Sequence, residues 1–592
     1  MNKRITIQVC MGTGGMAAGG AEVLATFESL MKEKNIPAEF KKECSMHKVG
    51  CRGLCARDVL VDVIAGDNRT TYQYIKPDMV QRIIDEHVVA GNPVSDWQVT
   101  DDYHKFHEKQ IKVVLSDCGN IDPEDIGAYI AAEGYKAIDK VFNAMSPEAV
   151  IDMIKKSGLR GRGGAGFPTG VKWEACRKAP GDRKYIICNA DEGDPGAFMD
   201  RAVIEGNPHA VLEGMVIGAY AIGATKGYVY IRAEYPLAVE RLKKAIKAAG
   251  ERGYLGKNIF NKGFDFDIKI KLGAGAFVCG EETALIASIE GQRGMPRAKP
   301  PFPVHHGLWG KPTVINNVET LANIPYIIKR GPEWFSSYGT EKSKGTKVFA
   351  LTGKVKNTGL IEVPMGITLK EIIYDIGGGI ENNKKLKAVQ TGGPSGGCIT
   401  GDMLDINVDY ESLAKVGSIV GSGGMIVLDE DDCMVNVAKY FLNFTQSESC
   451  GKCVPCRIGT KRLLEILDRI TKGLGKESDI DLLLKLSGDI KSASLCGLGQ
   501  TAPNPVLSTI KYFREEYEAH IKDKQCPAKV CRDLLTYSIL EDFCKGCGAC
   551  MRACPAGAVK GEKKKPHVIN AGACIKCGSC FDVCKFKAVS RG

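Results

Sequence analysis

Alternating and helical runs of apolar residues divide the chain into segments with different expected structures. The first segment begins with an alternating strand, ITIQVC at 5–10, followed by a helix over 21–34 and a second strand at 59–66, which is the order of a small α/β module. The polar stretch 91–109 is typical of a domain boundary. Apolar strands and helices then alternate with glycine-rich turns over 111–330. This alternation predicts an α/β domain whose loops hold a ligand.

The second half of the chain changes from strands to helices. Short β-branched strands separated by glycine pairs predict a small β-rich domain over 347–429. Apolar residues at helical spacing in 463–470 and 482–490 predict a helical region over 433–525. A cysteine-rich tail follows. We therefore predict five domains, which span 1–98, 99–340, 341–430, 431–532 and 533–592.

Composition and charge narrow the class of protein. The chain has no apolar run of about 18 residues, and its first residues lead directly into a strand, so we expect a cytoplasmic protein without a membrane span. In a reducing cytosol most of the 24 cysteines are expected to be metal ligands. The net charge of +10 is dispersed except at Lys560 and 563–565. This dispersal favours docking of an acidic electron carrier over a nucleic-acid partner.

Two cysteine runs with the spacing C-x2-C-x2-C-x3-C close the chain. Three thiolates two residues apart can wrap one face of a four-iron cubane, and the fourth cysteine of each run ligates the neighbouring cluster. The first predicted [4Fe-4S] cluster is held by Cys544, Cys547, Cys550 and Cys584, and the second by Cys574, Cys577, Cys580 and Cys554. A zinc ribbon or disulfides are the less favoured alternatives, because zinc sites use two cysteine pairs and not two four-cysteine runs.

A glycine-rich loop offers a candidate site for a phosphate group. Gly161, Gly163 and Gly166 form a G-x-G-x-x-G match, but it follows the amphipathic segment 146–159, which predicts a helix and not the strand that a Rossmann fingerprint requires. Exposed backbone N–H groups and nearby cations suit a phosphate and close approach by a flat ring. The flanking cations are Arg160, Arg162 and Lys172. A flexible hinge is the alternative interpretation.

Three further segments are interpreted as apolar strands that end in polar residues. They span 186–196, 280–283 and 314–320 and carry paired carboxylates and amides. Such groups are suitable hydrogen-bond partners for a flavin ring edge and for ribityl hydroxyls. The same pairs also occur as turn residues and helix caps, which leaves that interpretation open.

Taken together, these motifs carry a resemblance to a known family. The segments RGRGGAGFPTGVKW, NADEGDPG, GEETAL, KPPFP and VINNVET, followed by SCGKC at 449–453, Cys456 and Cys496, resemble the NADH- and FMN-binding subunit of respiratory complex I over about 110–525. The longer architecture resembles the flavoprotein subunit of soluble NAD-linked hydrogenases, including electron-bifurcating ones. The folds that this resemblance implies are a thioredoxin-like ferredoxin module, an FMN-domain α/β sandwich, a ubiquitin-like or β-grasp-like domain of the soluble-ligand-binding type, a helical bundle with a cluster, and a two-cluster bacterial ferredoxin tail.

The resemblance also implies which residues bind the cofactors. FMN would contact Gly161, Gly163, Lys172, Asn189, Asp191, Glu192, Gly280, Glu281, Asn316, Asn317 and Thr320, and NAD(H) would contact Phe167, Asp194, Glu282, Lys299 and Phe302. Hydride transfer would occur at FMN without a side-chain acid or base. A carboxylate at Glu282 would accept from the adenosine ribose and repel a 2′-phosphate, which favours NAD over NADP. Two departures are Asp194, where relatives often carry Glu, and Ala175, which replaces an aromatic residue.

Three more metal sites are expected. The protein's own [4Fe-4S] cluster would be held by Cys450, Cys453, Cys456 and Cys496, a strong spacing. In the first module, Cys10, Cys51 and Cys55 match three ligands of a two-iron ferredoxin, while Gly15 stands where relatives carry the fourth. Cys44 is the candidate replacement for a [2Fe-2S] cluster, and a module without a cluster is the alternative. A zinc site is expected from His520, Cys526, Cys531 and Cys433, with a metal-free loop as the alternative.

The sequence therefore predicts a subunit that converts between a hydride and single electrons. We expect NADH to reduce FMN and electrons to pass through [4Fe-4S] clusters to ferredoxin and a partner, with electron bifurcation as a further hypothesis. The expected hetero-oligomer contains a small thioredoxin-like [2Fe-2S] subunit and a catalytic subunit, hydrogenase-like or other. Alternatives are a diaphorase subunit of an NAD-dependent formate dehydrogenase or another complex, and an electron-relay scaffold with an altered flavin site.

Overall fold

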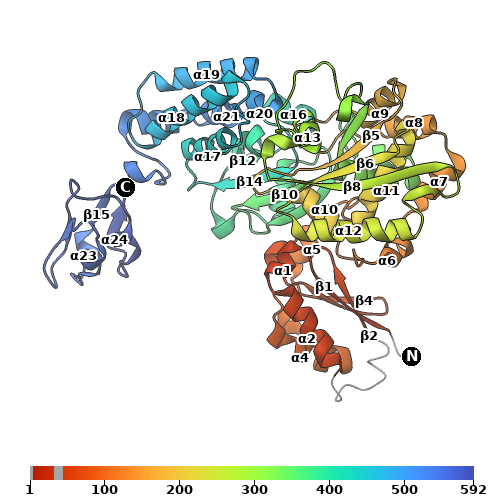
Figure 1. The fold of residues 1–592 in the computed structure, drawn as a ribbon. Helices are drawn as coiled ribbons and strands as arrows, with labels where there is room; N and C mark the ends of the chain where they lie inside the picture. The colour runs from red at the N-terminus through yellow and green to blue at the C-terminus, as the bar shows by residue number, and fades with distance from the viewer. Residues whose placement is uncertain (1–3, 33–43) are drawn as a thin grey trace. The chain divides into compact units, whose positions relative to one another are not determined.

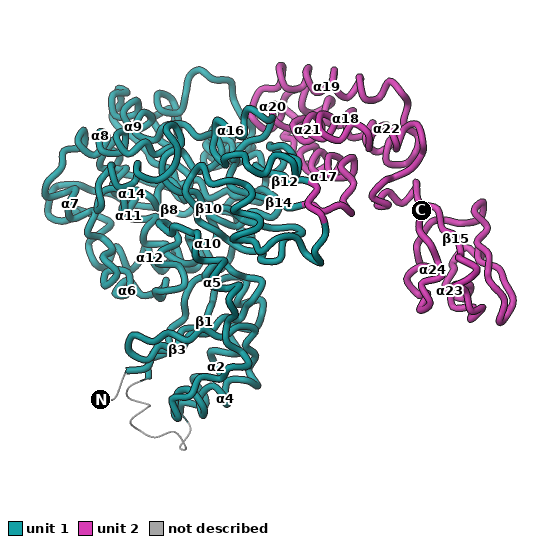
Figure 2. Tube along the Cα trace, turned by 180° about the vertical axis from the view of Figure 1, so that it is seen from behind, with its two compact units in different colours: residues 1–384, 388–427 teal, residues 385–387, 428–592 magenta. Residues whose placement is uncertain are grey.

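The computed structural model describes residues 4–32 and 44–592 (Figure 1). The chain forms two compact units (Figure 2). The first comprises residues 1–384 and 388–427, and the second comprises residues 385–387 and 428–592. The five domains proposed from the sequence remain a finer division that this clustering does not test.

A four-stranded sheet opens the first unit. Its order is β2-β1-β3-β4, with β1 (Ile5–Cys10) parallel to β2 (Cys44–Val49) and antiparallel to β3 (Val61–Ala65), which pairs with β4 (Asn68–Tyr72). The strand predicted at 5–10 is confirmed, and the predicted helix is α2 (Gly20–Lys32); its last two predicted residues lie outside the described ones. The other helices here are α1 (Thr13–Ala17), α4 (Val80–Arg82) and α5 (Asp101–Glu108).

A five-stranded sheet forms the centre of the first unit. Its order is β7-β8-β6-β5-β9, and β8, β6, β5 and β9 are mutually parallel. The strands are β5 (Tyr185–Ala190), β6 (Lys226–Arg232), β7 (Gly256–Ile259), β8 (Phe264–Gly273) and β9 (Thr313–Asn317). Because parallel neighbours require crossover connections, helices pack on this sheet, among them α9, α11 and α14. The helices of this part are α6 (Ile126–Ala131), α7 (Lys136–Ala144), α8 (Pro147–Ser157), α9 (Thr169–Lys178), α10 (Met199–Gly206), α11 (Pro208–Ile222), α12 (Pro236–Glu251), α13 (Glu282–Ile289), α14 (Val318–Arg330) and α15 (Pro332–Ser336).

The core of this part lies between the sheet and its helices. Nearly every residue of α11 is buried, because α11 packs on α14 and β5 as well as on α8 and α9. The core continues through the apolar residues of β5 and β6. The carboxyl ends of parallel strands, where such folds bind ligands, are thereby held in place.

A third sheet confirms the predicted β-rich segment. Its order is β11-β10-β14-β12-β13, with α16 (Tyr410–Lys415) as its companion helix. The strands are β10 (Thr346–Gly353), β11 (Gly359–Pro364), β12 (Leu386–Thr391), β13 (Gly397–Thr400) and β14 (Gly424–Asp429).

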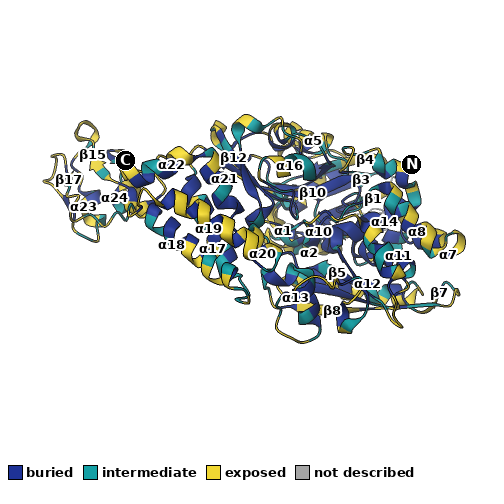
Figure 3. Ribbon diagram, turned by 90° about the horizontal axis from the view of Figure 1, so that it is seen from above, coloured by how far each residue is buried: buried dark blue, intermediate teal, exposed yellow. Residues whose placement is uncertain are grey.

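The second unit is helical before its cysteine-rich tail. Its helices are α17 (Met434–Ser447), α18 (Thr460–Thr471), α19 (Asp479–Ala493), α20 (Gly497–Thr501), α21 (Asn504–Tyr512) and α22 (Arg514–Glu518), and they carry buried and exposed residues on different faces (Figure 3). The periodic segments 463–470 and 482–490 lie within α18 and α19, as predicted. The tail contains the strand pairs β15 (Tyr537–Ile539) with β18 (Val589–Arg591) and β16 (Val559–Lys560) with β17 (Val568–Ile569), and helices α23 (Ala549–Ala553) and α24 (Ser579–Asp582).

Candidate functional site

The glycine-rich loop connects two helices. It follows α8, which ends at Gly158 in a left-handed conformation, and it leads into α9, so the Rossmann interpretation is excluded by structure as well as by sequence. Gly164 and Gly166 have φ values of 122° and 61°. Glycine is required at such positions because a Cβ is strained there. At Gly161, a Cβ would meet only the backbone of the loop's own Phe167, with the carbonyl oxygen at 3.6 Å and the nitrogen at 3.9 Å.

Two of the three cations beside this loop have structural roles. The buried guanidinium of Arg162 donates to the carbonyls of Lys344, Thr346 and Arg160. The guanidinium of Arg160 itself pairs with Glu411 at 2.6 Å. The buried guanidinium of Arg162 is thus committed to backbone carbonyls, and that of Arg160 to an ion pair. Lys172 is the flanking cation that was assigned to the FMN site.

Lys172 lies among residues assigned to both cofactors. Its Nζ donates to the Ile315 carbonyl at 3.2 Å and is 4.0 Å from a Glu282 carboxylate oxygen. It also lies over the ring of Phe167, 5.9 Å from its centroid. Burial lowers the pKa of Lys172. A phosphate or other anion nearby would favour its charged form.

Two asparagines meet at the carboxyl ends of adjacent parallel strands. Asn189 of β5 pairs in register with Asn317 of β9, and Cys188 pairs with Asn316. The Asn189 amide donates to the Gly280 carbonyl at 3.0 Å, which ties the strand end to the segment before α13. The Asn316 side-chain oxygen accepts from the Trp173 indole N–H at 2.8 Å. The predicted strand ends at β5 and β9 are thus confirmed and lie side by side.

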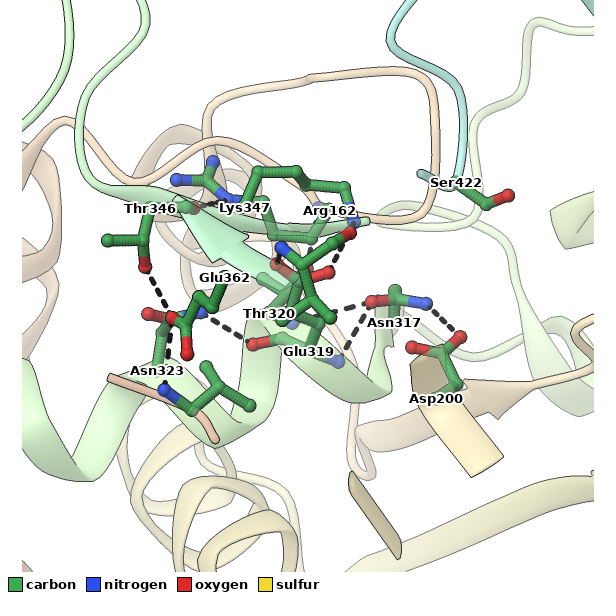
Figure 4. A network of polar contacts seen from close by, with 12 residues as sticks. Arg162, Asp200, Asn317, Glu319, Thr320, Asn323, Thr346, Lys347, Glu362 and Ser422 are labelled. Carbon is green, nitrogen blue, oxygen red and sulfur yellow. Dashed lines mark hydrogen bonds and ion pairs between the residues drawn. The ribbon is translucent and has the colours of Figure 1, made fainter. Parts of the chain in front are cut away.

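Asn317 also begins α14 and links it to α10 (Figure 4). Its side-chain oxygen accepts from the backbone N–H of Glu319 at 2.9 Å, and its amide donates to Asp200. Thr320, one turn into α14, accepts from the backbone N–H of Arg162 at 2.8 Å. A Cβ at Gly163 would lie 2.9 Å from the Asn317 Cβ. The glycine loop and the start of α14 therefore pack directly on each other.

The segment at Gly280 differs from the sequence interpretation. It is not a strand end but a short turn before α13, where the Glu281 carboxylate caps the helix by accepting from the N–H groups of Thr283 and Ala284 at 2.8 and 3.0 Å. The alternative of a helix cap is the correct one here. A Cβ at Gly280 would have the Asp191 carbonyl oxygen as its nearest neighbour, at 3.5 Å.

Acidic residues follow β5 in a buried environment. Burial raises the pKa of Glu192, whose carboxylate accepts from the backbone N–H groups of Asp200 and Arg201. Burial also raises the pKa of Asp194 to about 6, against the effect of a hydrogen bond from the Ser422 hydroxyl. Asp191 is buried as well.

The residues assigned to the dinucleotide are more exposed. Phe167 and Phe302 are 50% and 51% exposed. Lys299 donates to Glu281 and Glu282 at 3.1 and 2.9 Å. The Glu282 carboxylate therefore faces two lysines, Lys299 and Lys172. Their positive charges offset part of the repulsion that Glu282 is expected to exert on a 2′-phosphate.

These observations fit a bound flavin nucleotide. A Cβ added at Gly161 or at Gly280 would meet only ordinary contacts, the nearest at 3.6 and 3.5 Å. Amides, buried carboxylates and one lysine lie on the segments around these glycines, and they are the group types that a ring edge, ribityl hydroxyls and a phosphate require. Three residues that the sequence analysis missed contact the predicted site residues. Asp200 bonds to Asn317, Tyr235 to Glu192 and Ser422 to Asp194. No local motif marks them, since each comes from a distant segment.

The cysteines of the helical unit lie together. Burial raises the pKa of Cys456 to about 11, and the neighbouring thiols of Cys450, Cys453 and Cys496 contribute to the rise. The Cys456 sulfur is 3.2 Å from the Ser449 hydroxyl. Four thiols in one neighbourhood agree with the predicted four-iron site.

In the tail, cysteines of the first and the second run lie near one another. One cavity is lined by Cys544, Cys547, Cys550 and, from the second run, Cys584. Backbone N–H groups of Ala558 and Ala588 donate to the sulfurs of Cys554 and Cys584 at 3.2 and 3.3 Å. The cavity joins the residues of the first predicted cluster across the two runs. Cys580 has Cys574 and Cys577 as electrostatic neighbours.

Four buried side chains form a candidate metal centre in the second unit. The donor atoms of Cys433, His520, Cys526 and Cys531 all lie within 4.8 Å of one another, and no other group of this kind occurs among residues 4–32 and 44–592. The His520 Nε2 is 3.4 and 3.3 Å from the sulfurs of Cys433 and Cys531. Its Nδ1 donates to the Glu516 carbonyl at 2.7 Å. This bond orients the ring so that Nε2 faces the thiols, as in metal-ligating histidines.

The first module brings together three of its four assigned cysteines. The sulfurs of Cys51 and Cys55 are 3.2 Å apart, and the Cys10 thiol neighbours Cys51. Cys44 does not join them. In the β1–β2 register Cys44 pairs with Ile5, whereas Cys10 pairs with Val49 at the other end. Five residues along a parallel pair correspond to about 16 Å, so the assignment of Cys44 as the fourth ligand is wrong.

Other features agree with the sequence analysis. Five cysteines outside the predicted metal sites are buried: Cys118, Cys176, Cys188, Cys279 and Cys398. Within the described part of the chain, no helix has the length and apolarity needed to cross a membrane.

Comparison with known proteins identifies the class. Four family models match, namely the Nuo51 FMN-binding domain at 154–326, the SLBB domain at 348–399, the NADH-ubiquinone oxidoreductase-F iron-sulfur binding region at 436–520 and a 4Fe-4S dicluster domain at 536–585. The chain belongs to the family of FMN- and iron–sulfur-containing subunits of complex I and of NAD-linked hydrogenases. It is thus an oxidoreductase subunit.

Individual relatives span most of the chain. It is 63% identical over 484 residues to the NADP-reducing hydrogenase subunit HndC of Solidesulfovibrio fructosivorans, covering 82% of this chain and 98% of the relative. It is 46% identical to an NADH-quinone oxidoreductase subunit of Rhizobium meliloti, covering 69% and 98%. A crystal structure of an NAD+-reducing [NiFe]-hydrogenase in the air-oxidized state matches with a TM-score of 0.61 and 30% identity, covering 88% and 86%.

Proposed function

We propose that this chain exchanges hydride between NAD(H) and bound FMN and passes single electrons through its clusters to or from partner proteins. The observation that carries the proposal is the direct packing of the glycine loop on the start of α14, beside the paired asparagines at the ends of β5 and β9. Bound FMN would supply the conversion between a two-electron hydride and single electrons. Three four-cysteine groups give those electrons a route.

The roles of the residues follow from their contacts. Asn317 and Thr320 hold the loop against α14, so that backbone N–H groups face the cofactor phosphate. Asn189 fixes the Gly280 turn beside the ring position. Phe167, Phe302 and Lys299 form the exposed side, where a dinucleotide enters and leaves.

A paired substitution tests the flavin site. Gly280→Leu should place a side chain into the proposed flavin space without backbone strain, since its nearest contact is an ordinary 3.5 Å. Gly250→Leu in α12 is the matched control, because a Cβ there meets nothing within 4 Å. We expect about one FMN per chain and bleaching by NADH in wild type and in the control, and loss of both in Gly280→Leu. Flavin-free wild-type protein, purified anaerobically, would favour the relay-scaffold alternative.

A separate question is whether the proposed site binds NAD(H) or NADP(H). We favour NAD(H), supported by the carboxylates of Asp194 and Glu282 at the dinucleotide side. NADP(H) is the second candidate, because Glu282 faces Lys299 and Lys172 and because the HndC relative is named as NADP-reducing. Comparing kcat/KM for NADH and NADPH decides between them, and a preference for NADPH would reject the first assignment.

The proposal extends to partners. We infer a hetero-oligomer with a small [2Fe-2S] subunit, a catalytic subunit and ferredoxin as electron acceptor or donor, with a hydrogenase favoured over a formate dehydrogenase by the hydrogenase relatives. Electron bifurcation is proposed for the same assembly. It predicts obligate coupling of two acceptors, and uncoupled reduction of one acceptor by the intact complex would reject it. Identification of co-purifying chains tests the partner assignment.

The Cys433–His520–Cys526–Cys531 centre is proposed to hold zinc in a structural role. Two features support this: the donor set of three sulfurs and one nitrogen, and the backbone bond that fixes His520. All four ligands are buried, which leaves no open position for a substrate and fits a structural site.

A further inference from the structure

Three thiols in the first module are grouped without a fourth cysteine. Cys10 ends β1, while Cys51 and Cys55 lie in the loop after β2. The Cys51 and Cys55 sulfurs are 3.2 Å apart, close to the ~3.8 Å expected for two thiolates on one tetrahedral ion. The Cys10 thiol neighbours Cys51. The group is suited to an iron–sulfur cluster that lacks one ligand.

Neither position considered from the sequence can supply that ligand. Cys44 lies at the far end of the strand pair. Gly15 has no side chain, and a Cβ there would lie 2.3 Å from the Cys10 carbonyl oxygen. Since such a contact is sterically forbidden, the chain is packed closely where another cysteine would otherwise stand.

Asp58 occupies the open side of this group. Its Oδ2 is buried and has no hydrogen-bond partner in the described structure. A Cβ on Gly14 would lie 2.8 Å from this oxygen and 3.5 Å from the Cys55 sulfur, so the absence of a side chain at Gly14 leaves room between the two. The Cys10 thiol is a neighbour of the same carboxylate. A buried carboxylate oxygen without a partner is costly unless it binds something.

The nearest cation does not account for this oxygen. The Arg52 guanidinium forms its ion pair with Asp62, and Arg69 is 3.3 Å from that same carboxylate. Asp58 accepts a backbone hydrogen bond from Leu60. The Arg52 charge therefore acts on Asp58 without a hydrogen bond, and the Asp58 carboxylate lies beside the Cys10 and Cys55 thiols.

We propose that Asp58 is the fourth ligand of a two-iron cluster held by Cys10, Cys51 and Cys55. Cys51 and Cys55 would bind one iron, and Cys10 and Asp58 the other. The donor atoms of this set do not all fall within 4.8 Å of one another. Such a spread suits a cluster with two irons better than a single ion, and carboxylate oxygen is an accepted ligand for iron.

The site is anchored to the flavin-containing part of the first unit. Thr13, three residues after Cys10, donates to Glu205 of α10 from its backbone and its hydroxyl, at 2.9 and 2.6 Å. Arg241 of α12 donates to the Met11 carbonyl at 2.8 Å. The proposed two-iron cluster is thus a further electron-transfer centre, in addition to the three four-iron clusters, and it is anchored to the proposed flavin domain.

The test uses the full-length protein purified anaerobically. The iron content of the protein is measured first. The electron paramagnetic resonance signal of the dithionite-reduced protein is then recorded at a temperature where four-iron signals have broadened and two-iron signals remain. The variants are Asp58→Ala, Asp58→Cys and, as the matched control, Cys44→Ala. Wild type and Cys44→Ala should show the same two-iron signal. Asp58→Ala should lose it together with about two irons per chain.

Asp58→Cys separates ligation from a purely structural role. A thiolate at this position should restore the two irons but shift the g-values, because the ligand atom changes from oxygen to sulfur. Retention of the wild-type signal in Asp58→Ala or an unshifted signal in Asp58→Cys would overturn the proposal. Absence of a two-iron signal in wild type, or its loss in Cys44→Ala, would overturn it equally.

Discussion

Replacing Lys347 by methionine should destabilise the first unit strongly. Lys347 and Glu319 are 0% and 1% exposed and form an ion pair that joins β10 to α14 (Figure 4). Glu319 also accepts from the Val348 N–H at 2.9 Å. The methionine would fill similar volume but leave the carboxylate buried with no cation. Such a broken pair costs about 3–5 kcal/mol, which corresponds to about a hundredfold or more in the unfolding equilibrium.

Tryptophan fluorescence during urea unfolding isolates this effect. All four tryptophans of the chain lie in the first unit: Trp97, Trp173, Trp309 and Trp334. The fluorescence transition therefore reports unfolding of the first unit and not of the helices or the tail of the second unit. Fluorescence should show the unfolding transition of Lys347→Met at a clearly lower urea concentration.

Two comparison variants make the result interpretable. Lys257→Met breaks an exposed pair with Asp265, where Lys257 is 82% exposed, and should leave the urea midpoint close to that of the wild type. The double variant Glu319→Gln with Lys347→Met removes both charges of the pair and should recover most of the loss. If Lys347→Met costs no more than Lys257→Met, the buried pair is not the energetic link between β10 and α14.

Three further predictions concern the cofactor, the zinc site and the tail. Burial raises the Asp194 pKa to about 6, so the negative charge of Asp194 is present above that pH and lost below it. As the pH falls from about 8 to 5, the ratio of kcat/KM for NADH to that for NADPH should therefore fall more in the wild type than in Asp194→Asn. Equal pH profiles of this ratio in the two proteins would refute the prediction. Cys526→Ser should release about one zinc per chain in metal analysis and lower the unfolding temperature of the helical unit, whereas the exposed neighbour Val530→Ser should do neither. Cys584→Ser should alter the same low-temperature resonance signal as Cys544→Ser; alteration of the other cluster's signal would reverse the assignment.

Local sequence spacing was sufficient to predict which cysteines lie together at some of the sites. Cys450, Cys453 and Cys456 lie within one turn region, so their spacing alone brings the thiols together, and the tail runs follow the same logic. The grouping of His520, Cys526 and Cys531 with Cys433 was predictable because three unassigned residues of metal-ligating types fell in one short segment, with Cys433 remaining.

Features set by long-range packing were not predictable in the same way. Cys44 is close to Cys51 along the chain, yet strand register carries it to the opposite end of β1, and register depends on tertiary pairing. Arg162 resembled a phosphate ligand, but burial against β10 directs it to carbonyls. Asp58 carries no sequence signal because its significance lies in an orphaned buried oxygen.

The central claim is that electrons enter the clusters from a hydride through the flavin. Anaerobic stopped-flow mixing with NADH, followed at flavin and cluster absorbance, tests it directly. We expect flavin bleaching to precede cluster reduction in wild type, and Gly280→Leu to show neither while its clusters still accept electrons from dithionite. Cluster reduction by NADH in flavin-free protein would contradict the account.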